Sequence, residues 1–362
     1  MATPPNTLEH HAIGRDNNFN LLRMLAAMGV LISHAYPIPL GPKAAQPLET
    51  TLGGLTLGTV SVYVFFVISG FFIARSYDRT RSWQAFLSAR ALRLFPALAG
   101  VLLLTVLIAS VWLTTVSQGT FWAAAPQYLI RNVTLFSLKY ELPGVFTENP
   151  LGPAINGSLW TLSYEVICYA GVFLLGLAGL LGHRILMVAL VVGGLAAYAA
   201  SPAFQHHDRL YNIVTLSLPF VIGAASYAWR AYITLRVWPI LLLGGVALVL
   251  RLLSAEHSWA EPLFQTAFVL ALCYIVFVIG FWPVDVLRGY NRLGDYSYGI
   301  YIYAFPAQQF VAHLGVQTPL MNMCAAFLVA LPCAILSWHL VEAPALNIKA
   351  SIAEPKTRSP LG

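Results

Sequence analysis

The stretch Asn20-Leu-Leu-Arg-Met-Leu-Ala-Ala-Met-Gly-Val-Leu-Ile-Ser-His-Ala-Tyr36 is largely apolar but contains two ionisable side chains, Arg23 and His34. Its length and composition predict a membrane-spanning helix. Eleven positions separate the two side chains, so they share nearly the same helix face, about 16 Å apart along the axis. Ionisable groups inside a membrane are costly and normally mark a site or an ion pathway. The pair therefore indicates a functional face on this helix.

The composition of the whole chain predicts an all-α, polytopic membrane helix bundle. Of its 362 residues, 58% are hydrophobic and 9% are charged, and the mean hydropathy is +0.72. Soluble domains carry about 25% charged residues. Apolar runs of about twenty residues predict ten spans. We place them near residues 20–38, 54–75, 92–116, 158–180, 184–201, 210–229, 234–253, 262–282, 294–313 and 319–341.

The distribution of basic residues predicts the orientation. With ten spans, fifteen of the 20 Lys and Arg residues fall on the side of the N-terminus. Because basic residues concentrate on the cytoplasmic side, we expect both termini to be inside. The net charge of +6 then reflects topology and contact with the lipid bilayer, and we expect no nucleic-acid partner.

The sequence predicts one membrane domain. It covers residues 20–342, between a cytoplasmic N-terminal segment at 1–19 and a cytoplasmic tail at 343–362. Residues 1–18 lack the features of a signal peptide, so we expect the first span to be retained. The longest outer loop, residues 117–157, contains an amphipathic segment near 128–140, and a lid and a plain connector are equally compatible with it.

The cysteines predict packing and not metal binding. All four lie inside predicted spans and none forms a C-x-x-C pattern, so we expect no metal site. These residues are Cys168, Cys273, Cys324 and Cys333.

The two ionisable groups of the first span each have two interpretations. His34 is a candidate general base, because imidazole titrates near neutrality, or else a packing histidine bonded to a neighbour. Arg23 is a candidate phosphate or carboxylate contact, or else a snorkelling residue at the inner interface. Their shared face favours the functional interpretation of both.

Two further polar groups lie in and after the second span. Ser69 and Gly70 allow close approach of a ligand, or equally of another helix. Arg90 and Arg93 lie one turn apart and form a planar-donor pair suited to phosphate groups. We assign the remaining arginines of this inner loop to topology alone, namely Arg75, Arg79 and Arg81.

The fourth span carries Glu165, at a depth that would match His34. A carboxylate there would hold the imidazole in one tautomer, as in nucleophile-base-acid constellations. The alternative is a bond to Thr161 or Ser163, or a different cation as partner.

The last two spans hold a further polar cluster. Tyr298 and Tyr301 share a helix face and would line a polar channel. Asp295 and Ser297 are candidate helix caps. For Glu342 and His339, a structural pairing with an inner-loop arginine fits their position at least as well as catalysis.

These clusters, taken in order, resemble the integral membrane acyltransferase 3 family. Its members move acyl groups onto sugars of polysaccharides, lipopolysaccharide or oligosaccharide signals. The resemblance covers nearly the whole chain. The matching motifs are Arg-x10-His at Arg23 and His34, Phe-x-x-Ser-Gly-Phe from Phe66, Arg-x-x-Arg-Leu-Phe-Pro from Arg90, Ser158 to Glu165, Gly294 to Tyr301, and Val-Glu-x-Pro from Val341.

The resemblance implies an acyl-CoA donor, usually acetyl-CoA, and a carbohydrate acceptor, in a bacterial cytoplasmic (inner) membrane. We expect Arg90 and Arg93, with Arg23, to hold the phosphates of acyl-CoA. His34 would activate the acceptor hydroxyl, or be acylated transiently itself, since imidazole can do either. Glu165 would orient His34. Ser69, Tyr298 and Tyr301 would line the donor site. Many relatives carry a histidine just before the proline of the ninth span, whereas this chain has Ala304-Phe-Pro306, so no role is transferred there.

A multi-pass secondary transporter or flippase is the main alternative. In such a protein Arg23, His34 and Glu165 would relay protons or bind an anion. The arginines concentrated in one inner loop favour a cofactor site, and the sequence shows no internal repeat of the kind that builds many transporters. A purely structural subunit would leave the buried charges unexplained.

Overall fold

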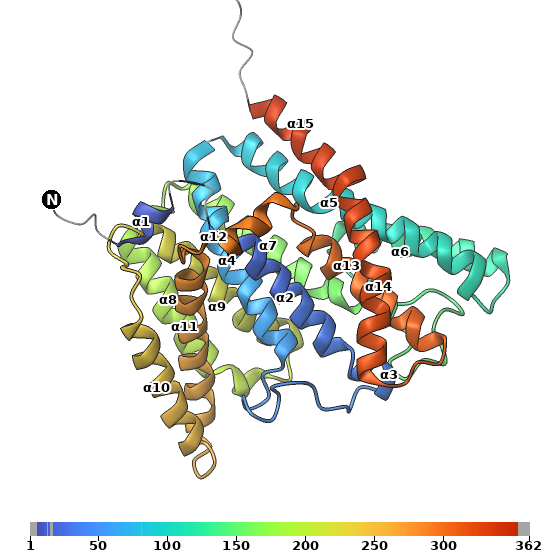
Figure 1. The fold of residues 1–362 in the computed structure, drawn as a ribbon, viewed down its shortest axis with the longest axis horizontal. Coiled ribbons are helices and arrows are strands. Elements are labelled where there is room, and N and C mark those ends of the chain that lie inside the picture. Colours follow the sequence, from blue (N-terminus) through green and yellow to red (C-terminus); the bar gives the residue numbers. More distant parts are fainter. Residues whose placement is uncertain (1–5, 13, 15–16, 81, 354–362) are drawn as a thin grey trace, which may run out of the picture.

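The computed structural model describes residues 6–12, 14, 17–80 and 82–353, and the regular elements of this part of the chain are helices (Figure 1). This confirms the all-α prediction. The helices are α1 Leu8–His11, α2 Phe19–His34, α3 Pro37–Leu40, α4 Leu57–Thr80, α5 Trp83–Ile108, η1 Ala109–Leu113, α6 Gln118–Thr134, η2 Gly157–Leu159, α7 Trp160–Leu177, α8 Arg184–Ala199, η3 Ser201–Phe204, α9 Asp208–Ala228, α10 Trp238–Leu253, α11 Ala260–Gly280, α12 Asp285–Arg288, η4 Gly289–Arg292, α13 Ser297–His313, α14 Pro319–Ser337, η5 Trp338–Glu342 and α15 Ala343–Ala353.

Seven helical stretches of the described residues are long and apolar enough to cross a membrane, so the chain is a multi-pass membrane protein. Each of the ten predicted spans coincides with a helix, but α8 and α10 have 16 residues each and α13 has 17. The count of ten and the orientation therefore stay predictions. The seven stretches are Phe19–Leu40, Leu57–Thr80, Trp83–Leu113, Gly157–Leu177, Asp208–Ala228, Ala260–Gly280 and Pro319–Ile348.

Helices α4 and α9 cross in close contact, and two glycines make this crossing possible. A Cβ atom on Gly70 would lie 2.0 Å from the carbonyl oxygen of Phe220, and one on Gly223 would lie 2.2 Å from that of Val67. Small residues at such positions allow the backbones of membrane helices to approach each other. Gly70 therefore serves helix packing, while the neighbouring Ser69 faces the other way.

Helix α2 lies in the middle of the bundle, against α4 and α13 (Figure 1). Its start is fixed by Asn18, whose side-chain nitrogen donates to the carbonyl oxygens of Ile279 and Trp282, 2.9 Å from each. Both carbonyl oxygens also accept from a backbone N–H of the turn that follows α11, so Asn18 adds a second bond to each. Asn18 thus holds the N-terminal end of α2 against the C-terminal end of α11.

Both predicted flanking segments contain helices that pack on the bundle. The nitrogen of Leu8, in α1, donates to the carbonyl oxygen of Ile233 at 2.9 Å. The last helix does not end at residue 342, because α14 continues through the π-helical turn η5 into α15, which packs on α5. Arg15, Lys356 and Arg358, which entered the count of basic residues, lie outside the described residues.

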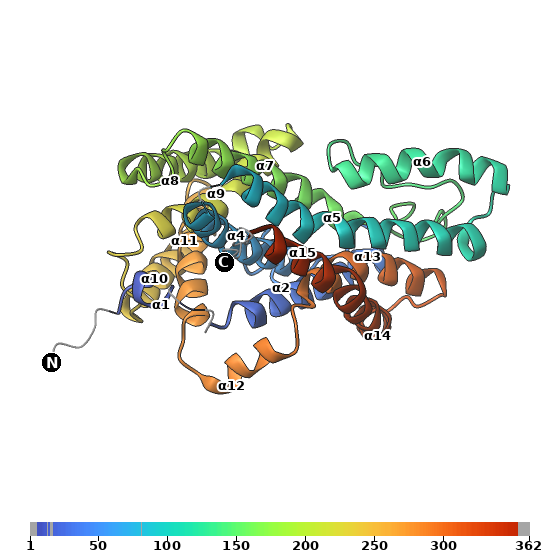
Figure 2. The ribbon, with the colours of Figure 1, turned by 90° about the horizontal axis from the view of Figure 1, so that it is seen from above.

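The loop predicted between the third and fourth spans contains α6, which runs alongside α5 (Figure 2). The helix begins after Ser117, whose hydroxyl accepts from Thr120 N. It therefore begins before the segment predicted at 128–140 and covers that segment only as far as Thr134. The rest of the loop is pinned to α13 by buried amides. Asn149 donates to Gln309, and Asn156 donates to the carbonyl oxygen of Ile302.

Candidate active site

A cavity of about 780 Å³ lies between α2, α4, α5, α7 and α13. It follows one face of α4, on which lining residues recur every three or four positions from Phe65 to Arg79. These two residues are fourteen positions apart, which corresponds to about 21 Å of helix. The cavity reaches the exposed Arg79, at the side that the basic residues predict to be inner. It is therefore a long channel into the bundle.

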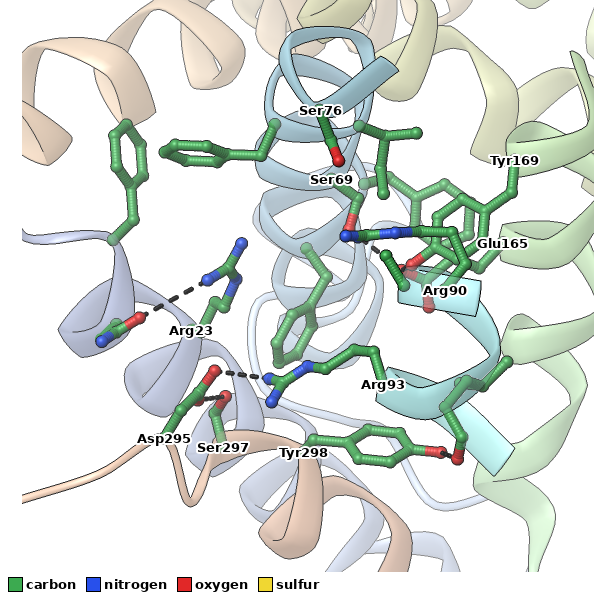
Figure 3. A pocket seen from close by; sticks show the side chains of 18 of the residues that line it. Arg23, Ser69, Ser76, Arg90, Arg93, Glu165, Tyr169, Asp295, Ser297 and Tyr298 are labelled. Atoms are coloured by element: carbon green, nitrogen blue, oxygen red, sulfur yellow. Dashed lines mark hydrogen bonds and ion pairs between the residues drawn. The ribbon is translucent and has the colours of Figure 1, made fainter. Parts of the chain in front are cut away.

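Arginine dominates the charge of this cavity. Among the described residues, five arginines and two carboxylates line it. Three guanidinium groups face one shared space, that of Arg23 from α2 and those of Arg90 and Arg93 from α5 (Figure 3). Arg75 and Arg79, which the sequence assigned to topology alone, line the same cavity, and Arg81 lies outside the described residues. The excess of positive charge fits a polyanionic ligand.

Arg93 is paired with carboxylates. Its Nη2 lies 2.5 Å from Asp295 Oδ2, its Nη1 lies 3.8 Å from Glu342 Oε2, and its guanidinium stands over the ring of Tyr298. Asp295 also accepts from the hydroxyl of Ser297. Asp295 thus joins α13 to α5 and makes no side-chain cap of α13, contrary to the capping interpretation. Much of the charge of Arg93 is already neutralised.

Arg23 and Arg90 differ from Arg93 in this respect. Among the described residues, neither has a carboxylate oxygen within 4.0 Å. Arg23 contacts Asn20 Oδ1 at 3.5 Å and stands over the ring of Phe72. The Nε of Arg90 is buried and has no hydrogen-bond partner in the described part of the chain. These two arginines therefore have donors available for a ligand.

Glu165 forms one wall of the cavity. Its Oε1 accepts from Ser69 Oγ at 3.0 Å and from the Tyr169 hydroxyl at 2.5 Å, beside Arg90 (Figure 3). The structure does not bring Glu165 to His34. The two residues occupy different positions along their helices: Glu165 lies more than one turn inside α7, whereas His34 is the last residue of α2. The orienting contact expected between them is absent.

Tyr298 and Tyr301 both line the cavity, as the shared face predicted. The Tyr298 hydroxyl donates to the carbonyl oxygen of Leu94 at 2.9 Å, which ties α13 to α5. The Tyr301 hydroxyl bonds to Ser158 O at 3.0 Å and to the hydroxyl of Thr161. Tyr301 and Thr161 bound the end of the cavity that lies far from Arg79.

His34 lies beyond that end and does not line the cavity. Its half-buried ring makes an edge-to-face contact with Phe305, with 5.2 Å between the ring centroids. Phe305 is four residues after Tyr301 on α13, so His34 is about one helical turn, or roughly 6 Å, further along the bundle. The Nδ1 atom of His34 is buried without a hydrogen-bond partner in the described residues.

The residues that sequence reasoning missed fall into two kinds. Tyr169 follows Glu165 by four positions and shares its helix face, so this spacing was a usable signal. The partners of Arg93 are 202 and 249 positions away and carried no local signal. No group of three or more His, Cys, Asp or Glu side chains that could hold a metal ion occurs within the described residues.

Comparison with known proteins gives one family and several relatives. The model of the family described as "Acyltransferase domain" matches residues 16–339. An "O-acetyl transferase" of Shigella phage Sf6 is 28% identical, over 91% of this chain and 95% of that protein. "Nodulation protein 10" of Rhizobium leguminosarum bv. viciae is 26% identical, over 94% and 96% of the two chains.

A further relative is "Exopolysaccharide production protein ExoZ" of Rhizobium meliloti (strain 1021). It is 28% identical, over 83% of this chain and 93% of that protein. No solved structure matches the chain.

Proposed function

Because the chain belongs to the acyltransferase domain family, we propose that this membrane enzyme moves an acyl group from acyl-CoA to a hydroxyl of a carbohydrate. The relative named as an O-acetyl transferase favours acetyl as the group transferred. The relative named for exopolysaccharide production favours a carbohydrate acceptor. The proposed location is a bacterial inner membrane, with both termini inside and the donor entering from the cytoplasm.

The observation that carries this proposal is the excess of arginine over carboxylate in a channel that leads into the bundle. Coenzyme A is a polyanion whose diphosphate needs several donors. Arg23 and Arg90 supply planar, permanently charged donors that match phosphate geometry. Because neither is paired with a carboxylate in the described residues, we assign the diphosphate to these two and not to Arg93.

The shape of the cavity supports a path for the rest of the donor. The pantetheine arm would follow the face of α4, past Phe72 and Ser69, toward the apolar end at Phe65. The thioester would then lie near Tyr301 and Thr161, one helical turn from the contact between Phe305 and His34. Donor and acceptor would thus meet at the outer end of the channel.

The proposed chemistry uses His34 as the general base. The imidazole takes the proton of the acceptor hydroxyl while its oxygen attacks the thioester carbonyl, which forms a C–O bond. The C–S bond then breaks, and the leaving thiolate takes the proton from the imidazolium. The products are an O-acyl ester and free CoA. The family assignment favours this reaction over the transporter interpretation.

The test is transfer of label from acetyl-CoA by the purified full-length protein in liposomes. With a carbohydrate extract as acceptor, we expect labelled ester and one free CoA thiol per ester formed. The result that overturns the proposal is flux of a solute across the liposome membrane that needs no CoA, together with no stabilisation of the protein by CoA.

A further inference from the structure

Three buried polar atoms without partners in the described residues belong to α2, α13 and α14. They are His34 Nδ1, Gln308 Oε1 and Asn322 Oδ1. The side chains of Gln308 and Asn322 are completely buried. Buried polar groups normally have a hydrogen-bond partner in the protein or in ordered water. One of these atoms belongs to the proposed base, so their lack of partners calls for a functional explanation.

The orientation of the Gln308 amide follows from its neighbour. Its Nε2 donates to the carbonyl oxygen of Leu31 at 2.9 Å. A carbonyl can only accept, so the amide nitrogen must face Leu31 and the amide oxygen must point elsewhere. The same carbonyl accepts from Ala35 N at 3.1 Å, within α2. The Gln308 amide therefore lies beside the helical turn that carries His34.

The packing of the two helices agrees with this placement. Leu31 and His34 are three residues apart on α2, and Phe305 and Gln308 are three apart on α13, so each pair shares a helix face. Leu31 contacts Gln308 and His34 contacts Phe305. The imidazole and the amide thus lie in the same interface. Nδ1 is also the ring nitrogen nearer to the backbone, where the amide lies.

We propose that Gln308 is the positioning residue of His34. Because neither Nδ1 nor the amide oxygen has a partner among the described residues, one ordered water bridges them: it accepts a hydrogen bond from Nδ1–H and donates one to the amide oxygen. This arrangement leaves Nε2 unprotonated as the base. This inference rests on the proposed function for the role of His34. It replaces Glu165, whose Oε1 is bonded to Ser69 and Tyr169, in the orienting role.

Asn322 supports this arrangement from α14. Its Nδ2 donates to the backbone carbonyl of Gln308 at 3.0 Å, and so fixes the turn of α13 from which the Gln308 side chain projects. A neutral amide suits the task, since it selects a tautomer without placing a second charge beside the imidazole.

The first test uses the unmodified protein. In the full-length chain with ¹⁵N-labelled histidine, the signal of His34 is assigned by its loss in His34→Gln. We expect the neutral ring to carry its proton on Nδ1. A neutral ring with its proton on Nε2 would overturn the proposal, and this outcome does not depend on any variant at Gln308 folding.

The second test compares Gln308→Met with Gln309→Met. Gln309 is the matched control, because it is equally buried on the same helix but donates to Leu151 O and Ala154 O. We expect Gln308→Met to lower kcat for acetyl transfer about tenfold to a hundredfold, part of what a positioned base supplies, with KM for acetyl-CoA unchanged. It should also abolish the tautomer preference of His34, whereas Gln309→Met keeps it.

Equal kcat values for Gln308→Met and the wild type would overturn the positioning role. A failure of the proposed base role is distinguishable from a failure of this inference. If His34 is not the base, His34→Ala keeps full activity, but the position of the proton on the wild-type ring still shows whether Gln308 orients His34.

Discussion

Arg93 Nη2 and Asp295 Oδ2 lie 2.5 Å apart and join α5 to the start of α13. Arg90 lies one turn earlier on α5 and has no carboxylate partner within 4.0 Å among the described residues. Two arginines that look equivalent in sequence therefore belong to different networks. Both line the cavity, but Arg93 links two helices through carboxylates, whereas Arg90 does not.

We predict that Arg90→Gln and Arg23→Gln each weaken acetyl-CoA binding about tenfold or more. A charge-assisted hydrogen bond contributes about 1.5–3 kcal/mol, and each variant loses at least one. Titration of the purified protein with acetyl-CoA measures the Kd. Arg236→Gln is the control, because Arg236 is exposed and outside the cavity. Equal Kd values in all variants would contradict this assignment.

Arg93→Gln should act on stability more than on donor affinity. It leaves Asp295 and the buried Glu342 without their shared cation, and breaking such a pair costs about 3 kcal/mol or more. We expect a fall in apparent Tm of about 5 °C or more. Arg93→Gln and Asp295→Asn should be non-additive in a double-mutant cycle. Additive effects would show that the two side chains act separately.

Gly157→Ala should lower kcat without changing the Kd for the donor. A Cβ atom at this position would lie 2.6 Å from the ring of Phe305, on which His34 rests. Because a small misplacement of a catalytic group is costly, we expect a loss of about tenfold to a hundredfold in the acetyl-transfer assay. The double variant Gly157→Ala/Phe305→Leu should recover part of it. Wild-type kcat in Gly157→Ala would refute the coupling.

The crossing of α4 and α9 gives a further prediction. Gly70→Ala should destabilise the protein, because its Cβ would lie 2.0 Å from Phe220 O and the two helices would have to separate. Gly171→Ala on α7 is the matched control, since no atom lies within 4 Å of its added Cβ. Thermal unfolding in detergent measures the difference. Equal Tm values for both variants would show that the crossing tolerates the methyl group.

Sequence alone predicted the helical bundle because membrane helices are apolar over their full length. The lengths of α8, α10 and α13 left the number of spans undecided. Their apolar character is local, whereas whether a helix crosses the membrane also depends on tilt and on neighbouring helices.

Spacing along one helix predicted which face lines the site, but not which side chains of different helices contact one another. The spacing of Tyr298 and Tyr301 correctly placed both in the cavity. The direction of Glu165 depended on how α7 packs against α4, so its bond to Ser69 could not be read from spacing. The sequence did not predict that Arg75 and Arg79 line the cavity, because a basic inner loop fits topology equally well.

The acetyl-transfer kinetics of His34→Ala test the role of His34 most directly, with the folded state checked by the Kd for CoA. We predict a loss of kcat of about a hundredfold or more, as expected for removal of a general base. The Kd for CoA should not change, because His34 lies outside the proposed donor cavity. Full kcat in this variant would show that His34 does not activate the acceptor hydroxyl.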